Sequence, residues 1–151
     1  MRKHALAAVA ALSVALLLCA TAHAADFQAD LDPAAHDNST RAQVRGEGRV
    51  TGTLTGNRLT VTGRFSGLAS NAAKARIGQA MVLGAPATTF FADLVITNAS
   101  AGLITGNATL TPAQLASLGN SPLFIQIDAV NTTPNGNLWG WFIPVAARSA
   151  R

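Results

Sequence analysis

The chain has few of the residues on which most catalytic and metal sites depend. Its 151 residues include one cysteine, three histidines and no tyrosine, and charged residues make up only 12% of the composition. A disulfide framework needs at least two cysteines, so it is excluded within this chain. No nucleophile elbow, phosphate-binding loop or zinc-protease motif is present. The sequence therefore favours a non-catalytic protein that uses no cofactor.

Metal ligands of the usual types gather only near the start of the chain, where His36 follows Asp30 and Asp32 and precedes Asp37. Pro33 and the polar residues around it are typical of a loop. The two interpretations are a metal site and a solvated polar loop. We favour the loop and predict no metal site.

The first 24 residues are typical of a secretory signal peptide. Arg2 and Lys3 precede an apolar run at 5–20, and a small-x-small motif at 22–24 predicts cleavage after Ala24. A membrane anchor is the alternative, but the apolar run is short for a span. Lipidation at Cys19, the only cysteine, is a further alternative, although Leu18 stands where lipoprotein signals carry a small residue.

Export and cleavage would leave one domain, residues 25–151, in the periplasm or outside the cell, with no membrane span. Removal of Arg2 and Lys3 lowers the formal net charge from +4 to +2. The remaining basic residues are scattered and do not alternate with aromatic residues. The composition therefore gives no support for nucleic-acid binding.

Short apolar segments separated by Gly, Pro and Asn predict β-structure along the mature chain. In residues 59–65, apolar residues and glycine occupy the odd positions, and threonine or arginine the even positions. This alternation predicts a half-buried strand, and a turn at 55–57 completes a hairpin over 50–65. Further strands are expected at 26–31, 75–83, 90–97 and 103–110, and a second hairpin at 122–144.

One short helix is expected near residues 112–118. Thr111 is a good N-cap, Pro112 suits the first helical position, and Gln114 can complete a capping box. Gly119 is expected to end the helix in the left-handed conformation. Seven or eight strands with one helix predict an all-β fold. We expect a Greek-key-like antiparallel β-sandwich, with a barrel as the alternative.

Four stretches occur in an order and spacing that resemble the CHRD domain, the module named from chordin and also found alone in exported bacterial proteins. They are residues 63–68 (GRFSGL), 75–77 (ARI), 106–118 (GNATLTPAQLASL) and 123–140. The resemblance covers roughly residues 27–144. It implies a β-sandwich-like exported domain and does not imply an enzyme.

The CHRD family often carries two histidines in an "AHIH" stretch and a third in a "VNVHT" strand, which together could bind a metal. The matching positions in this chain are Arg76, Gly78 and Asp128. The resemblance therefore implies that the metal ligands have been lost. Arg76 and Asp128 could instead form a cross-strand ion pair, or they could be unrelated surface charges.

The family's ending also sets the phase of the second hairpin. By that phase Ile125 and Ile127 face the core opposite Gly140 and Leu138. The outward set is Phe124, Gln126 and Asp128, opposite Trp141, Trp139 and Asn137. Two tryptophans and a phenylalanine on an outer face predict a binding surface for a protein, a carbohydrate or a second copy of the chain.

The alternative is that the loop at 32–45, or the tail after Pro144, covers these rings. The function that we expect is an exported, non-catalytic binding module built on Phe124, Gln126, Asp128, Trp139 and Trp141. Alternative functions are a metal-binding or superoxide-dismutase-like exported protein and a purely structural envelope protein.

Overall fold

The computed structural model describes residues 24–145. Residues 1–23 and 146–151 lie outside the described residues. Nearly all of the expected signal peptide, including Cys19, falls in the first of these segments, so the signal peptide and export remain predictions.

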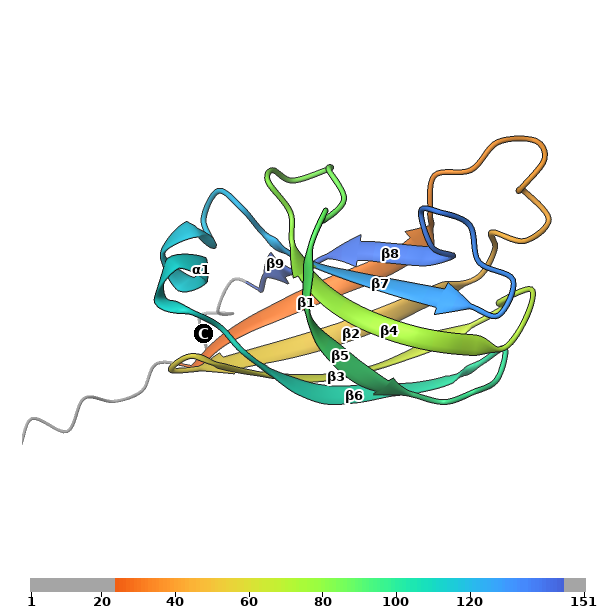
Figure 1. Cartoon of the computed structure of the whole chain (residues 1–151). Coiled ribbons are helices and arrows are strands. Elements are labelled where there is room, and N and C mark those ends of the chain that lie inside the picture. Colours follow the sequence, from red (N-terminus) through yellow and green to blue (C-terminus); the bar gives the residue numbers. More distant parts are fainter. Residues whose placement is uncertain (1–23, 146–151) are drawn as a thin grey trace, which may run out of the picture.

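The described residues form one sheet and one short helix (Figure 1). The elements in chain order are β1 (Ala24–Pro33), β2 (Glu47–Thr55), β3 (Arg58–Ser66), β4 (Ala72–Gln79), β5 (Phe90–Ile96), β6 (Gly102–Thr109), α1 (Pro112–Ser117), β7 (Leu123–Ala129), β8 (Leu138–Trp141) and β9 (Ile143–Pro144). All the strand pairs are antiparallel. The all-β prediction is confirmed.

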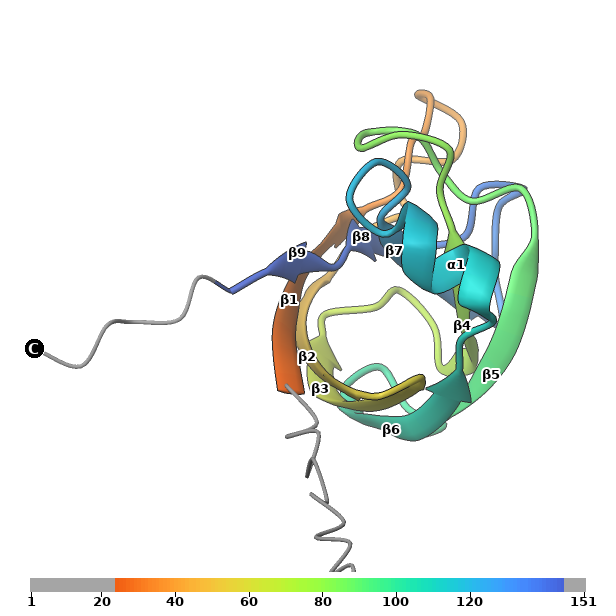
Figure 2. The same cartoon turned by 90° about the vertical axis from the view of Figure 1, so that its left-hand side faces the viewer.

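The expected sandwich is wrong, because the sheet closes into an eight-stranded barrel. The strand order is β2-β3-β6-β5-β4-β7-β8-β1, and β1 pairs again with β2. The first strand is long enough to pair with β2 over 24–31 and with β8 at Asp32 and Pro33. The short β9 pairs with β1 along the edge that also pairs with β8 (Figure 2). Closure of this kind removes the open edges that a sandwich would leave.

The barrel interior follows the predicted alternation. The hairpin of β2 and β3 turns at Gly56, which has a φ of 60°. Leu59, Val61 and Phe65 are buried on the inner side of β3, while the residues between them are exposed or partly exposed. Phe142 is also fully buried, and a Cβ added at Gly52 would lie 3.2 Å from its ring. The glycine on β2 therefore leaves the space that this large ring fills.

The helix α1 lies over one end of the barrel (Figure 2). Thr111 and Gln114 form the predicted capping box, with Pro112 in the first turn. The side-chain amide of Gln79 donates to the carbonyls of Gln114 and Ser121, which holds the helix against β4. Leu115 and Leu118 pack against the barrel core. The helix thus covers the hydrophobic interior at this end of the barrel.

The expected left-handed glycine at the end of the helix is wrong. Gly119 does not have a positive φ, and the C-cap residue Leu118 stays right-handed. The N–H groups of Asn120 and Ser121 both donate to the Ser117 carbonyl. These hydrogen bonds satisfy the Ser117 carbonyl at the end of the helix without the left-handed turn that a Schellman motif requires.

The strand expected at 75–83 ends early, at Gln79. The chain then turns out of the sheet at residues 80–89, which we call the β4–β5 loop. A β-bulge between Ile77 and Gly78 places Gly78 opposite Phe90 and Ile77 opposite Ala92. Because a bulge re-aims the side chains on one side of it, Phe90 joins the outer face of the barrel.

Candidate functional site

The predicted register of the second hairpin is confirmed. Ile125 pairs with Gly140 and Ile127 with Leu138, and all four residues are buried. On the other side of the ladder, Phe124 pairs with Trp141 and Gln126 with Trp139. The predicted site residues therefore do lie on the outer face of the barrel.

That outer face carries a second hydrophobic cluster. Phe124 is fully buried, and its ring centroid lies 6.4, 5.9 and 5.6 Å from those of Phe90, Trp139 and Trp141. We call these four residues the outer aromatic cluster. The two tryptophans are only partly buried. They are therefore the only members of the predicted aromatic set, Phe124, Trp139 and Trp141, that an incoming molecule can reach.

The β4–β5 loop covers Phe124. Ala80 and Ala87 of this loop pack on the ring, and Trp141 Nε1 donates to the Ala85 carbonyl over 2.8 Å. Gly78 makes this approach possible, since a Cβ there would collide with the Thr89 carbonyl and lie 2.6 Å from Ala87 Cβ. A loop therefore does cover Phe124, but residues 80–89 supply it instead of the expected loop at 32–45, and the tail from residue 146 onward lies outside the described residues.

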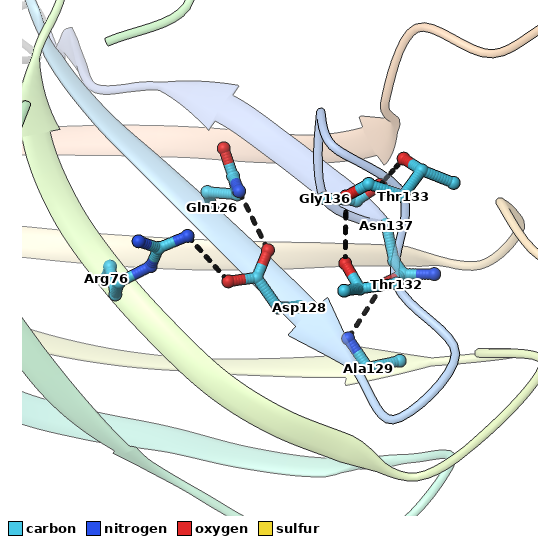
Figure 3. A network of polar contacts seen from close by, with 8 residues as sticks. All are labelled: Arg76, Gln126, Asp128, Ala129, Thr132, Thr133, Gly136 and Asn137. Atoms are coloured by element: carbon cyan, nitrogen blue, oxygen red, sulfur yellow. Dashed lines mark hydrogen bonds and ion pairs between the residues drawn. The ribbon is translucent and has the colours of Figure 1, made fainter. Parts of the chain in front are cut away.

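Arg76 and Asp128 form the cross-strand ion pair that the sequence left open. Arg76 Nη2 lies 2.7 Å from Asp128 Oδ2, and Gln126 Nε2 donates to Asp128 Oδ1 over 2.7 Å (Figure 3). The guanidinium also stacks on Phe90, with Cζ 4.1 Å from the ring centroid. Both carboxylate oxygens are therefore engaged by side chains of this chain.

The three positions that match the family's histidines belong to a polar network instead of the family's set of ligands, and in the described residues the buried Arg76 Nε has no hydrogen-bond partner. Gly78 contributes no side chain, and Gln126 is almost fully buried beneath its neighbours. Among residues 24–145, no group of three or more His, Cys, Asp and Glu side chains is arranged to hold a metal ion. The outer face therefore offers side chains that can contact a partner. Asp128 and Gln126 hold the strand beneath Trp139 in place.

The hairpin phase predicted Asn137 in the outward set, and this prediction is wrong. Asn137 is fully buried at the end of the hairpin, where its side chain accepts from the Ala129 N–H over 2.7 Å (Figure 3). Its amide donates to the carbonyls of Gln43 and Asn131. A buried amide with all these partners ties the β1–β2 connection to the hairpin.

The N-terminal acidic residues serve local structure. Asp30 pairs with Arg49 at 2.7 Å, and the ring nitrogen Nδ1 of His36 lies 2.9 Å from the Ala34 carbonyl. Asp37 accepts hydrogen bonds first from the Ser39 side chain and then from Thr40, which lowers its pKa to about 2. The loop interpretation holds for His36 and Asp37, whereas Asp30 and Asp32 belong to strand β1, because both residues pair with neighbouring strands.

A groove of about 590 Å³ lies beside Trp141, and Phe124 is not among its lining residues. It is lined by Gln28, Asp30, Leu83, Trp141, Ile143, Pro144 and Val145, and we call it the Trp141 groove. Among these residues, the sequence predicted only Trp141 as a contact with a binding partner, while Asp30 entered only as a candidate metal ligand. The others come together because β9 turns along β1 and because residue 83 belongs to a loop instead of a strand. The signal that was available is the apolar run Met81, Val82, Leu83 beside a Gly-Ala-Pro turn.

Comparisons with protein-family models, with curated proteins and with solved structures found no match. In the part of the chain that the structure describes, no helix is both long and apolar enough to cross a membrane.

Proposed function

We propose that this protein is an exported, non-catalytic, CHRD-like binding module and that it holds its partner in the Trp141 groove. The observation that carries the proposal is the groove itself. It combines an indole ring and four apolar residues with one amide and one carboxylate. A mostly apolar concavity with a few polar groups is the usual form of a small-ligand site, and about 590 Å³ is within the usual range of size.

A neutral carbohydrate suits these groups best. The flat indole offers a face for the apolar side of a sugar ring, since tryptophan combines a large apolar surface with defined geometry. Gln28 and Asp30 can accept hydrogen bonds from sugar hydroxyls, and Gln28 can also donate. The charge of Asp30 is already balanced by Arg49. An uncharged ligand therefore leaves no unpaired charge in the groove.

The test is a glycan-array screen of the mature protein, followed by calorimetric titration of the soluble oligosaccharides that bind. Trp141→Phe and Asp30→Asn should weaken binding at least about tenfold, because each removes a ligand contact of roughly 1.4 kcal/mol. Trp139→Ala is the matched control. Trp139 belongs to the same aromatic cluster but does not line the groove.

Other outcomes would redirect or end the proposal. Reversible dimerisation that Trp141→Phe abolishes, without glycan binding, would assign the groove to a second copy of the chain. Capture of a protein partner that depends on Asp30 and Trp141 would assign it to protein recognition. A protein that binds no glycan or partner and does not self-associate would contradict the binding module and favour a structural envelope protein.

A further inference from the structure

The tip of the β4–β5 loop exposes three large apolar side chains in a row. Met81, Val82 and Leu83 are 77%, 57% and 63% exposed. None of residues 80–89 is ionisable. Three or more consecutive exposed apolar residues weaken solubility and are unusual unless they serve a function. We therefore expect these three side chains to be covered by another molecule when the protein functions.

The loop holds this tip in a fixed conformation. The Ala80 N–H donates to the Pro122 carbonyl over 2.9 Å, and Ser121 Oγ donates to the Met81 carbonyl over 3.1 Å. The Ala85 N–H closes a turn onto the Val82 carbonyl, and Trp141 Nε1 binds the Ala85 carbonyl. With both sides of the loop bonded to the barrel, the apolar side chains project into solvent instead of folding back onto the protein.

The apolar surface continues from the tip to the last strand. Leu83 lines the Trp141 groove together with Ile143 and Val145, which are 45% and 49% exposed. Trp141 lies beside the loop, with its ring against Phe124 and Trp139 and its N–H bonded to the Ala85 carbonyl. Tryptophan in such a position is typical of the boundary between lipid and water.

The size and charge of this surface decide which occupant fits. A standard protein interface takes about 20–30 residues from each partner. Here five large apolar residues are exposed together, and the tip carries no charge that would select a protein partner. A lipid bilayer requires no complementary surface and accepts protruding uncharged side chains.

We propose that the tip formed by Met81, Val82 and Leu83 inserts into the outer part of a lipid bilayer, with Trp141 at the level of the headgroups. The contact is peripheral and reversible, because a few apolar side chains bind no more strongly than a single acyl chain. No lysine or arginine lies in the tip or the groove lining. Binding should therefore depend little on anionic lipid and on salt.

The experiment is co-sedimentation of the mature protein with phosphatidylcholine vesicles, with and without added phosphatidylglycerol. Each inserted apolar side chain should change the partition coefficient by roughly tenfold. Met81→Ser/Val82→Ser should then lower it about 100-fold while leaving the groove lining intact. Val95→Ser/Leu103→Ser is the matched control, because these residues are similarly exposed, at 72% and 63%, but lie on β5 and β6.

Lipids brominated near the headgroup should quench the tryptophan fluorescence of the bound protein, and Trp141→Phe should remove most of that quenching. Absence of vesicle binding, loss of binding in high salt, or an equal effect of the control pair would overturn the proposal. Self-association that the serine pair removes, with no vesicle binding, would also overturn it. Glycan binding in the groove should survive the serine pair, so failure of either proposal can be recognised separately.

Discussion

The two faces of β7 carry two hydrophobic clusters that are built in different ways. On the inner face, Leu123, Ile125 and Ile127 join a core to which all eight barrel strands contribute. On the outer face, Phe124 packs with the rings of the outer aromatic cluster and with two alanines of one loop. Most members of the first cluster come from strand alternation. The second exists only because a bulge, a glycine and a loop bring its members together.

This difference implies that barrel stability and access to the outer rings are separable. The inner cluster is enclosed by the sheet, so it opens only when the barrel opens. The outer cluster is enclosed by the β4–β5 loop, so movement of ten residues is enough to expose it. Substitutions in the two clusters should therefore differ in both size and kind of effect.

The largest expected effect compares two phenylalanines of equal burial. Phe142 in the interior is 1% exposed and Phe124 under the loop is 0% exposed. Phe142→Ala should lower the free energy of unfolding by about 3–5 kcal/mol, since the closed barrel cannot fill the cavity. Phe124→Ala should cost less, about 2–3 kcal/mol, because the loop can collapse onto the gap. Urea unfolding of both variants tests this, and an equal or larger loss for Phe124→Ala would contradict the comparison.

The next effect should come from Gly78→Ala. The new methyl group would collide with the Thr89 carbonyl and with Ala87, both in the loop. We expect a loss of about 1–3 kcal/mol and stronger acrylamide quenching of tryptophan, because the loop must move away from the outer face. Gly119→Ala is the control, since nothing lies within 4 Å of a Cβ there. Unchanged quenching in Gly78→Ala would mean that the loop does not control access.

A smaller effect concerns the ion pair on the outer face. The side chains of Arg76 and Asp128 are 26% and 15% exposed, whereas those of Arg49 and Asp30 are 63% and 58% exposed. A double-mutant cycle with Arg76→Met and Asp128→Asn should give a coupling of about 1–2 kcal/mol, because partial burial limits screening. The same cycle on Arg49 and Asp30 should give about 0–0.5 kcal/mol. Equal coupling energies for the two pairs would show that partial burial does not strengthen the pair of Arg76 and Asp128.

The smallest effect is expected at Asp37. Its hydrogen bonds from Ser39 and Thr40 lower its pKa from 3.8 to about 2. A lowered pKa means that these bonds stabilise the loop fully above pH 3.8 and that this contribution is lost as the pH falls through about 2. The gain is small because the carboxylate is exposed. Carboxyl NMR titration should give a midpoint near 2, and Ser39→Ala should raise it; an unchanged midpoint would assign the shift to another cause.

Features set by neighbouring residues were predictable from the sequence. The alternation in residues 59–65 predicted β3, and the capping box of Thr111 and Gln114 predicted α1. The resemblance to the CHRD ending implied the phase of the second hairpin and hence the pairing of Ile125 with Gly140. Each of these depends on side chains within a few positions or within one hairpin. The binding role of the tryptophans and the CHRD relationship remain predictions.

Features set by distant residues were not predictable. Barrel closure depends on β1 meeting β8, and no local pattern records that contact. Met81, Val82 and Leu83 have the composition of a strand. The pairing of β4 with β7 nevertheless ends at Gln79, which lies opposite Leu123, so no partner strand continues beside residues 81–83. The Trp141 groove requires both the loop and β9, so it was missed for the same reason.

The way in which β1 completes the barrel has a consequence for how the chain folds. Asp32 pairs with Trp139, and Gln28 pairs with Ile143. The first strand therefore cannot complete its pairing until the last strands have formed. Chains dominated by such distant pairings fold slowly, in milliseconds to seconds, because loop closure costs entropy before the contacts form. Until β8 is available, β1 and β7 each have an edge without a partner. A chain cut short before Leu138 would keep both edges open and ready to pair with other chains.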